Sequence, residues 1–137
     1  MPSSRLRVGI DLVRVSRVEE SLAQFGERFL QRVFTDAEIA YARSAPAQAA
    51  ERLAARMAAK EAAVKALRMA HQGVGWRQIE VVRDASGACE LVLHGRARDI
   101  AEEAGADDLS VSLSHEGDYA TAVVVTRLRG DLESQSS

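Results

Sequence analysis

The chain has 137 residues, of which 47% are hydrophobic, 28% are charged and 4% are aromatic, and its formal net charge is −2. This length predicts one domain over 1–128 with a single aliphatic core, and the polar residues 129–137 are predicted to be a disordered tail. The small net charge argues against nucleic-acid binding, and the absence of an apolar run of about 20 residues argues against a membrane span. The single Cys89 and the lack of an apolar segment after Met1 favour the cytoplasm.

The first elements show clear periodic patterns. Apolar and polar residues alternate over 5–13, which predicts a strand with its aliphatic side chains on one face and Asp11 on the other. Ser16 followed by Glu19 is typical of a capping box that opens a helix over 16–25.

Helices and strand pairs follow. Thr35 with Glu38 repeats the capping-box pattern and opens a helix that ends before Pro46, and an Ala-rich helix is predicted over 48–70. The remaining predicted elements are strands over 76–83 and 89–93 joined by a turn, a helix over 96–104, and strands over 109–115 and 119–127 joined by a second turn. Together they predict an α+β fold in which an antiparallel sheet packs on the long Ala-rich helix.

The long helix carries a charge where a hydrophobic residue is expected. Its apolar stripe is formed by Leu53, Met57, Val64 and Leu67. At roughly 100° per residue, Lys60 falls within this stripe and Glu61 lies beside it. Burial of an unpaired ammonium is costly, so Lys60 either extends along the stripe to water or needs an anion that the fold or a ligand supplies.

Residues that break the local pattern form a candidate site. They are Asp11 at the end of the first strand, Lys60 and Glu61 on the long helix, and His115 at the end of a later strand. Two carboxylates can hold Mg²⁺, while Lys and His can neutralise phosphate oxygens. Ordinary roles remain open: a surface ion pair for Asp11, or an i, i+4 pair of Glu61 with Lys65. His115 can equally be a hydrogen-bonded strand residue.

Basic residues gather around the first predicted helix, at Arg14, Arg17, Arg28 and Arg32, with glutamates among them. A mixed, solvated surface would explain this pattern. A docking face for an acidic protein would explain it as well, because complementary charge speeds and orients encounter.

Five short motifs along residues 6–127 resemble one known family. They are Gly9-Ile10-Asp11, Phe34-Thr35 with Glu38, Arg56 to Ala62, Trp76 with Ile79-Glu80-Val81, and Ser112 to His115. In this order they are similar to the holo-acyl-carrier-protein synthases, the small 4′-phosphopantetheinyl transferases. The chain departs from the family at Arg68-Met69-Ala70, where many relatives have Gly-Thr-Gly, and at Gly87-Ala88-Cys89, where Gly-Lys-Pro is common.

The resemblance implies a single domain of the 4′-phosphopantetheinyl transferase type. Such a domain transfers the 4′-phosphopantetheine group from coenzyme A to a Ser of an apo acyl carrier protein, with Mg²⁺ and release of adenosine 3′,5′-bisphosphate. On the matching positions, the implied metal ligands are Asp11 and Glu61, the catalytic residues are Glu61, Lys65 and Asp11, and the cofactor-binding residues are Arg56, Lys60, Lys65 and His115. The implied base is Glu61 or a water on the metal.

The resemblance also implies partners. The carrier protein would be the acidic partner of the basic residues around the first helix, with Arg14, Arg17 and Arg28 as the predicted docking residues. The small members of the family form homotrimers with coenzyme A between subunits. Two other functions stay open: a non-catalytic module that binds coenzyme A or a carrier protein, and an unrelated metal-dependent phosphohydrolase. The latter has little support, because the sequence shows two candidate carboxylates and no Asp-rich or His-rich cluster.

Overall fold

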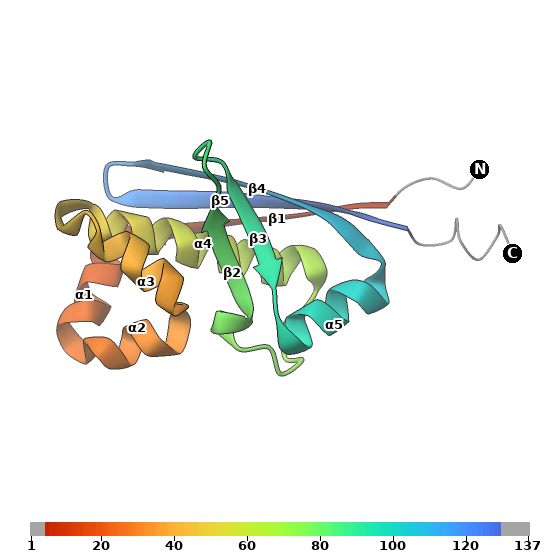
Figure 1. Cartoon of the computed structure of the whole chain (residues 1–137), viewed down its shortest axis with the longest axis horizontal. Coiled ribbons are helices and arrows are strands. Elements are labelled where there is room, and N and C mark those ends of the chain that lie inside the picture. Colours follow the sequence, from red (N-terminus) through yellow and green to blue (C-terminus); the bar gives the residue numbers. More distant parts are fainter. Residues whose placement is uncertain (1–4, 130–137) are drawn as a thin grey trace, which may run out of the picture.

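A long helix lying along a three-stranded sheet forms the framework of the molecule (Figure 1). The computed structural model describes residues 5–129, so the predicted tail lies outside the described residues from residue 130 on. The helices and strands are β1 (Arg5–Arg14), α1 (Val15–Phe25), α2 (Glu27–Val33), α3 (Asp36–Arg43), α4 (Ala49–Leu67), β2 (Ile79–Arg83), β3 (Cys89–Leu93), α5 (Gly95–Ala104), β4 (Ala106–Glu116) and β5 (Tyr119–Leu128). Within residues 5–129, no helix has the length and apolar character needed to cross a membrane.

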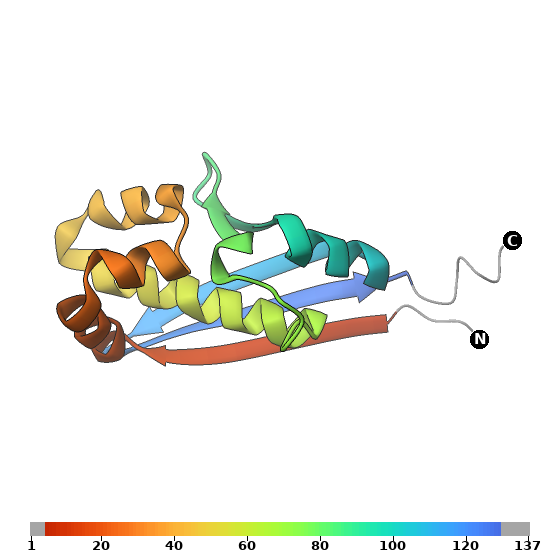
Figure 2. The same ribbon diagram turned by 90° about the horizontal axis from the view of Figure 1, so that it is seen from below.

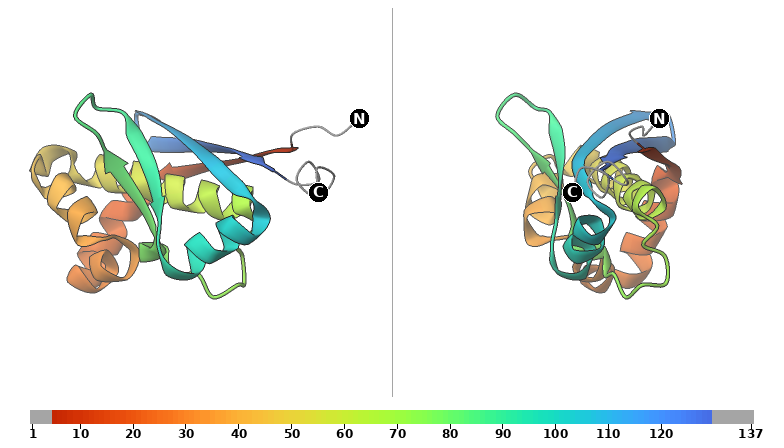
Figure 3. Two further views of the ribbon diagram at one scale, coloured as in Figure 1. Left: turned by 45° about the vertical axis from the view of Figure 1, so that its right-hand side comes forward. Right: turned by 90° about the vertical axis from the view of Figure 1, so that its right-hand side faces the viewer.

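The strands form two antiparallel units. The larger sheet has the order β1-β5-β4, and β2 pairs only with β3. Helix α4 lies along one face of the larger sheet, with α1, α2 and α3 at one end of the molecule (Figure 2). Seen along the long axis, α4 lies between this sheet on one side and β2, β3 and α5 on the other (Figure 3). This arrangement confirms the predicted α+β fold.

Helix α4 is buried on most of its surface because alanine allows other elements to approach closely. Its fully buried alanines include Ala54, Ala58, Ala59, Ala62 and Ala63. On β1, a Cβ added to Gly9 would lie 2.0 Å from the carbonyl oxygen of Ala62, so the strand and helix backbones touch there. The predicted apolar stripe describes this helix poorly, because Met57 and Val64 are only partly buried while the alanine faces form the core.

The aliphatic face of β1 points away from α4 and is open to solvent in the single chain. Its exposed side chains are Leu6 at 66%, Val8 at 66%, Ile10 at 60% and Leu12 at 61%. On the neighbouring strand β5, Val123 pairs with Ile10 and Val125 pairs with Val8. Contiguous exposed aliphatic patches of this kind are typical of interaction surfaces.

The structure confirms the capping box predicted at the start of α3 but not the one predicted at the start of α1. The capping box of Thr35 and Glu38 is confirmed at the start of α3. At α1, the predicted box of Ser16 and Glu19 is wrong, because the N-cap is Arg14 and no side chain caps it. Instead, Asp118 accepts hydrogen bonds from the backbone N–H of Ser16 at 2.8 Å and from its hydroxyl at 2.7 Å, which ties α1 to the β4–β5 turn.

Candidate functional site

Asp11 and Glu61 lie side by side where β1 crosses α4. Asp11 projects from the side of β1 that faces the helix, close to the point at which the two backbones touch. The adjacent Asp11 side chain, as a hydrogen-bonding neighbour and through its negative charge, acts together with burial to raise the pKa of Glu61 to about 7, while Arg17 and Lys65 oppose the shift.

One oxygen of Asp11 lacks a partner. The ammonium of Lys65 donates to Asp11 Oδ1 at 3.1 Å and to the carbonyl oxygen of Ile10 at 3.0 Å. Asp11 Oδ2 is buried and has no hydrogen-bond partner. Buried polar atoms are nearly always paired, so an orphan oxygen beside a second carboxyl group is typical of a cation site.

The ligand set indicates which cation would fit. Among residues 5–129, no group of three or more His, Cys, Asp or Glu is placed to hold a metal ion. Asp11 and Glu61 therefore offer two oxygen donors and leave the remaining positions to water or substrate. Mg²⁺ prefers this arrangement, because it keeps several waters and binds proteins through one or two carboxylates plus phosphate oxygens.

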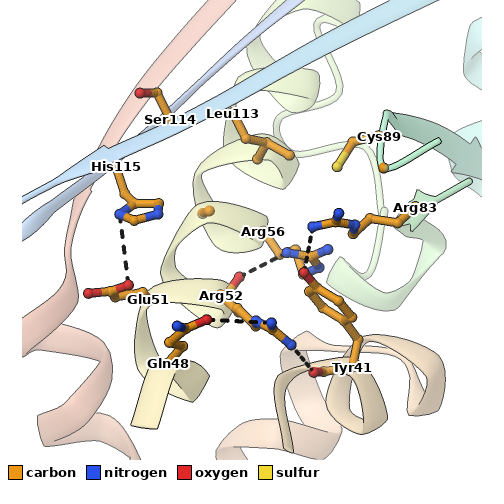
Figure 4. A pocket seen from close by; sticks show the side chains of 12 residues that line it. Tyr41, Gln48, Glu51, Arg52, Arg56, Arg83, Cys89, Leu113, Ser114 and His115 are labelled. Carbon is orange, nitrogen blue, oxygen red and sulfur yellow. Dashed lines mark hydrogen bonds and ion pairs between the residues drawn. The ribbon is translucent and has the colours of Figure 1, made fainter. Parts of the chain in front are cut away.

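A basic groove of about 330 Å³ lies on another side of α4 (Figure 4). Elements α3, α4 and β4 and the β2–β3 hairpin line it, and its charged or polar lining includes Tyr41, Glu51, Arg52, Arg56, Arg83 and His115. Three guanidinium groups and one imidazole, set against a single carboxylate, give this groove the chemistry of an anion site.

Two predicted cofactor residues line this groove. Arg56 is only 5% exposed, and burial lowers the pKa of its guanidinium. Its Nη1 donates to the carbonyl oxygen of Arg52 at 3.3 Å, while its Nε is buried without a partner. His115 is exposed at the end of β4, with Nδ1 3.8 Å from Glu51 Oε2. Arg56 therefore carries unmet hydrogen-bonding capacity inside the groove.

The carboxylate pair and the basic groove lie on different flanks of one chain. Arg56 and Glu61 are five residues apart, which places them about 140° apart around the axis of α4. The sheet separates their partners too, since Asp11 belongs to the edge strand β1 and His115 to the opposite edge strand β4. The structure thus brings Asp11, Glu61 and Lys65 together but keeps His115 and Arg56 in a separate cluster.

Lys60 faces neither cluster, in contrast to the prediction that it binds cofactor. Its side chain is 0% exposed, and its ammonium lies 2.8 Å from Glu38 Oε1. It also donates to the carbonyl oxygens of Trp76 and Ile79. Burial lowers the pKa of Lys60 while Glu38 opposes that shift. The fold, rather than a ligand, supplies the anion that Lys60 needs.

The three predicted docking arginines lie at the end of the molecule formed by the first helices. Arg14 precedes α1, and its guanidinium carbon is 5.9 Å from the ring centre of Tyr119. Arg17 on α1 is close enough to Glu61 to affect its pKa, and Arg28 on α2 lines a shallow pocket with Phe25. All three arginines are exposed.

The prediction from sequence missed three residues of the groove: Tyr41, Arg52 and Arg83. Arg52 lies one helical turn before Arg56, so their i, i+4 spacing was a usable signal. Tyr41 and Arg83 gave no comparable signal, because they reach the groove from α3 and from the end of β2.

Comparisons with known proteins agree on one family. The model of the 4′-phosphopantetheinyl transferase superfamily matches residues 7–124. The holo-[acyl-carrier-protein] synthase of Gloeobacter violaceus is 48% identical over 118 residues, covering 86% of this chain and 89% of the relative. That of Koribacter versatilis is 46% identical over 121 residues, covering 88% and 96%.

Solved structures with the same fold include two coenzyme A complexes. The Chronobacterium ammoniagenes ACPS-CoA complex has a TM-score of 0.80 at 36% identity, covering 91% of this chain and 98% of that chain. The Helicobacter pylori holo-[acyl-carrier-protein] synthase in complex with coenzyme A has a TM-score of 0.76 at 28% identity, covering 87% and 98%.

Proposed function

The chain belongs to the 4′-phosphopantetheinyl transferase superfamily, and we propose that the Asp11–Glu61 pair and the basic groove carry out its reaction. It transfers the 4′-phosphopantetheine group from coenzyme A to a serine of an apo acyl carrier protein and releases adenosine 3′,5′-bisphosphate. The assignment of the site depends on the buried, unpartnered Oδ2 of Asp11 beside the carboxyl group of Glu61.

Asp11 and Glu61 are the proposed ligands of Mg²⁺. When bound, the ion would neutralise oxygens of the coenzyme A diphosphate. Asp11 would offer its free Oδ2 while Oδ1 stays on Lys65, and Glu61 would bind the ion in its ionised form. The side chain of Lys65 is 57% exposed, so its ammonium is free to donate to a diphosphate oxygen as well.

Glu61 is also the proposed base. A serine hydroxyl is hardly ionised at neutral pH and must lose its proton as it attacks phosphorus. Glu61 lies beside Asp11 at the proposed site, and its carboxylate, once ionised, can accept that proton. The serine oxygen then bonds to the phosphorus next to pantetheine, the bond to the bridging oxygen breaks, and adenosine 3′,5′-bisphosphate leaves.

Substrate binding is divided between two surfaces in this proposal. Arg56 and His115 contact phosphate groups of coenzyme A, while Lys60 stays in the core. Arg14, Arg17 and Arg28 dock the acidic carrier protein, since they are exposed and Arg17 lies near Glu61. Nucleic acid and membranes have no role in the proposal, and a cytoplasmic location stays a prediction.

We propose a homotrimer in which the carboxylates of one chain face the groove of the next. Two observations support it: the two clusters lie on different flanks of α4, and residues 5–129 leave the aliphatic face of β1 exposed. Co-expression of Asp11→Ala with Arg56→Ala chains tests the arrangement. Random 1:1 mixing gives about a quarter of the interfaces two intact halves, so about a quarter of wild-type activity should return. Two inactive variants that never complement each other would refute shared sites.

The transfer itself is tested by intact-protein mass spectrometry of several apo carriers incubated with coenzyme A and Mg²⁺. We expect one phosphopantetheine added per carrier, and no addition when the carrier serine is replaced by alanine. Binding of coenzyme A with no mass shift on any carrier would instead favour the non-catalytic module. Chelation of Mg²⁺ with no loss of transfer would remove the metal assignment while leaving the activity intact.

A further inference from the structure

Tyr41 is the common contact of the three arginines that line the basic groove (Figure 4). The guanidinium carbons of Arg52, Arg56 and Arg83 lie 4.1, 4.3 and 5.3 Å from the centre of its ring. Its hydroxyl accepts a hydrogen bond from Arg83 at 2.6 Å, and its backbone carbonyl accepts one from Arg52 at 2.8 Å. One neutral residue thus contacts three cations through its ring and two oxygens.

The three cations lack the partner that arginines usually have. Within the described part of the chain, none of Arg52, Arg56 and Arg83 has a carboxylate within ion-pair distance, although nine other ion pairs are present. Like charges this close repel one another, and the charge of Arg83 helps burial to lower the pKa of Arg56. An anion with more than one charge that enters the groove would balance the cluster.

The chemistry of Tyr41 suits this task better than a carboxylate would. The face of an aromatic ring attracts guanidinium groups by about 0.5–2 kcal/mol each without neutralising them. Aspartate or glutamate at this place would pair with the arginines and compete with the incoming anion. Tyr41 gathers the cations and leaves their full charge for the ligand.

We propose that Tyr41 is a positioning residue that holds Arg52, Arg56 and Arg83 together, so that the groove selects donors with a phosphate monoester dianion in addition to their diphosphate. This inference rests on the proposed function, because it concerns the donor of the same reaction. A merely structural role, in which the ring fills space between α3 and α4, would instead affect folding and all donors alike.

Steady-state kinetics with coenzyme A and 3′-dephospho-coenzyme A separates these roles. Tyr41→Phe, which loses only the bond to Arg83, should raise KM for coenzyme A about threefold, and Tyr41→Leu, which also loses the ring, about tenfold. We expect kcat to change by less than about twofold and KM for dephospho-coenzyme A to stay within about twofold. Tyr119→Phe is the matched control, since this other tyrosine lies outside the groove, and it should leave both donor KM values unchanged.

Calorimetry supplies a readout that does not depend on transfer. Tyr41→Leu should weaken binding of adenosine 3′,5′-bisphosphate about tenfold but leave binding of AMP nearly unchanged, and thermal unfolding of both Tyr41 variants shows whether they are folded. Equal KM increases for the two donors, or a lower kcat with unchanged KM, would overturn the inference. If the wild-type protein transfers nothing to any carrier, the proposed function fails, and a Tyr41 variant that keeps wild-type preference for the bisphosphate separately overturns the role of Tyr41.

Discussion

Helix α4 carries two lysines, Lys60 and Lys65, whose surroundings differ in almost every respect. Lys60 is fully buried, and its ammonium has Glu38 and two backbone carbonyls as partners. The side chain of Lys65 is 57% exposed, and it holds only one of the two oxygens of Asp11. We call the Lys60–Glu38 pair the complete network, because every polar atom in it has a partner. We call the group of Lys65, Asp11 and Glu61 the incomplete network, because one oxygen of Asp11 has none.

The difference shows how to tell a structural ion pair from a site. The Lys60–Glu38 pair leaves no polar atom of its own unpartnered, so a ligand has nothing to add there. Around Lys65, one carboxylate oxygen is unpartnered and a neighbouring carboxyl group is protonated at a pH where glutamate is normally ionised. Because the pKa of Lys60 is displaced as well, unmet hydrogen bonding, more than burial, charge or a displaced pKa alone, marks the place where chemistry can occur.

The largest change in stability should come from removing the lysine of the complete network. Lys60→Met leaves the buried carboxylate of Glu38 without its cation, and we expect the free energy of unfolding to fall by about 3–5 kcal/mol in urea titrations. Lys65→Met is the matched control on the same helix and should change it by less than about 1 kcal/mol, because its ion pair is exposed. Equal losses in the two variants would erase the distinction.

Substitutions of the carboxylates in the incomplete network should lower activity and leave stability unchanged or higher. Asp11→Asn and Glu61→Gln should each lower kcat/KM for transfer by about 100-fold or more, because each removes a proposed metal ligand and a charge that the mechanism uses. Their thermal unfolding should match or exceed that of the wild type, since each substitution relieves repulsion between carboxylates. Asp99→Asn is the control, because Asp99 is exposed on α5 and belongs to neither residue cluster. Full activity in both site variants would refute the metal assignment.

The raised pKa of Glu61 adds a pH dependence of stability at the carboxylate pair. The fold raises the pKa of Glu61 from its ordinary 4.5 to about 7, so the folded state holds a proton that the unfolded chain has already lost in this range. Stability without metal should therefore fall as the pH rises from about 4.5 to about 7.

Metal binding should follow the opposite course. Because Mg²⁺ displaces this proton, its affinity, measured by calorimetry, should weaken as the pH falls below about 7. Glu61→Gln should abolish both pH dependences, and their survival in that variant would locate the titration elsewhere.

The smallest effects should come from the exposed arginines near the incomplete network. Arg14→Glu should raise KM for the carrier several-fold while KM for coenzyme A stays unchanged, and added salt should shrink the difference. Arg98→Glu on α5 is a control of equal charge change. Arg17→Glu should affect carrier binding and the pKa of Glu61 together, because Arg17 acts on both. Equal increases in KM for carrier and coenzyme A in Arg14→Glu would rule out docking.

Much of the fold was predictable because local patterns dominate it. The second hairpin, the Ala-rich helix and the capping box of Thr35 all follow from periodicity and turn chemistry within short windows. The errors arose where a distant partner replaced a local one. Ser16 is held by Asp118, which is 102 residues away, so its local capping pattern was misleading.

The site was predictable in part for the same reason. Asp11 and Glu61 were identified because they carry charge beside apolar positions and match a known motif. Lys60 was predicted to bind the cofactor because it belongs to the motif from Arg56 to Ala62, and its ion-pair partner Glu38 lies on a different helix, which spacing along the chain does not reveal. Tyr41 was missed because a tyrosine in a short helix gives no signal until the fold surrounds it with arginines.

The contact at Gly9 has a consequence for Asp11, two residues further along β1, and for the neighbouring Glu61. With no side chain at this position, β1 rests directly on the carbonyl oxygen of Ala62, the residue that follows Glu61. The close approach of β1 to α4 at Gly9 therefore sets the distance between the carboxyl groups of Asp11 and Glu61. A methyl group at this position would push the strand away from the helix and separate the two carboxyl groups without contacting either of them.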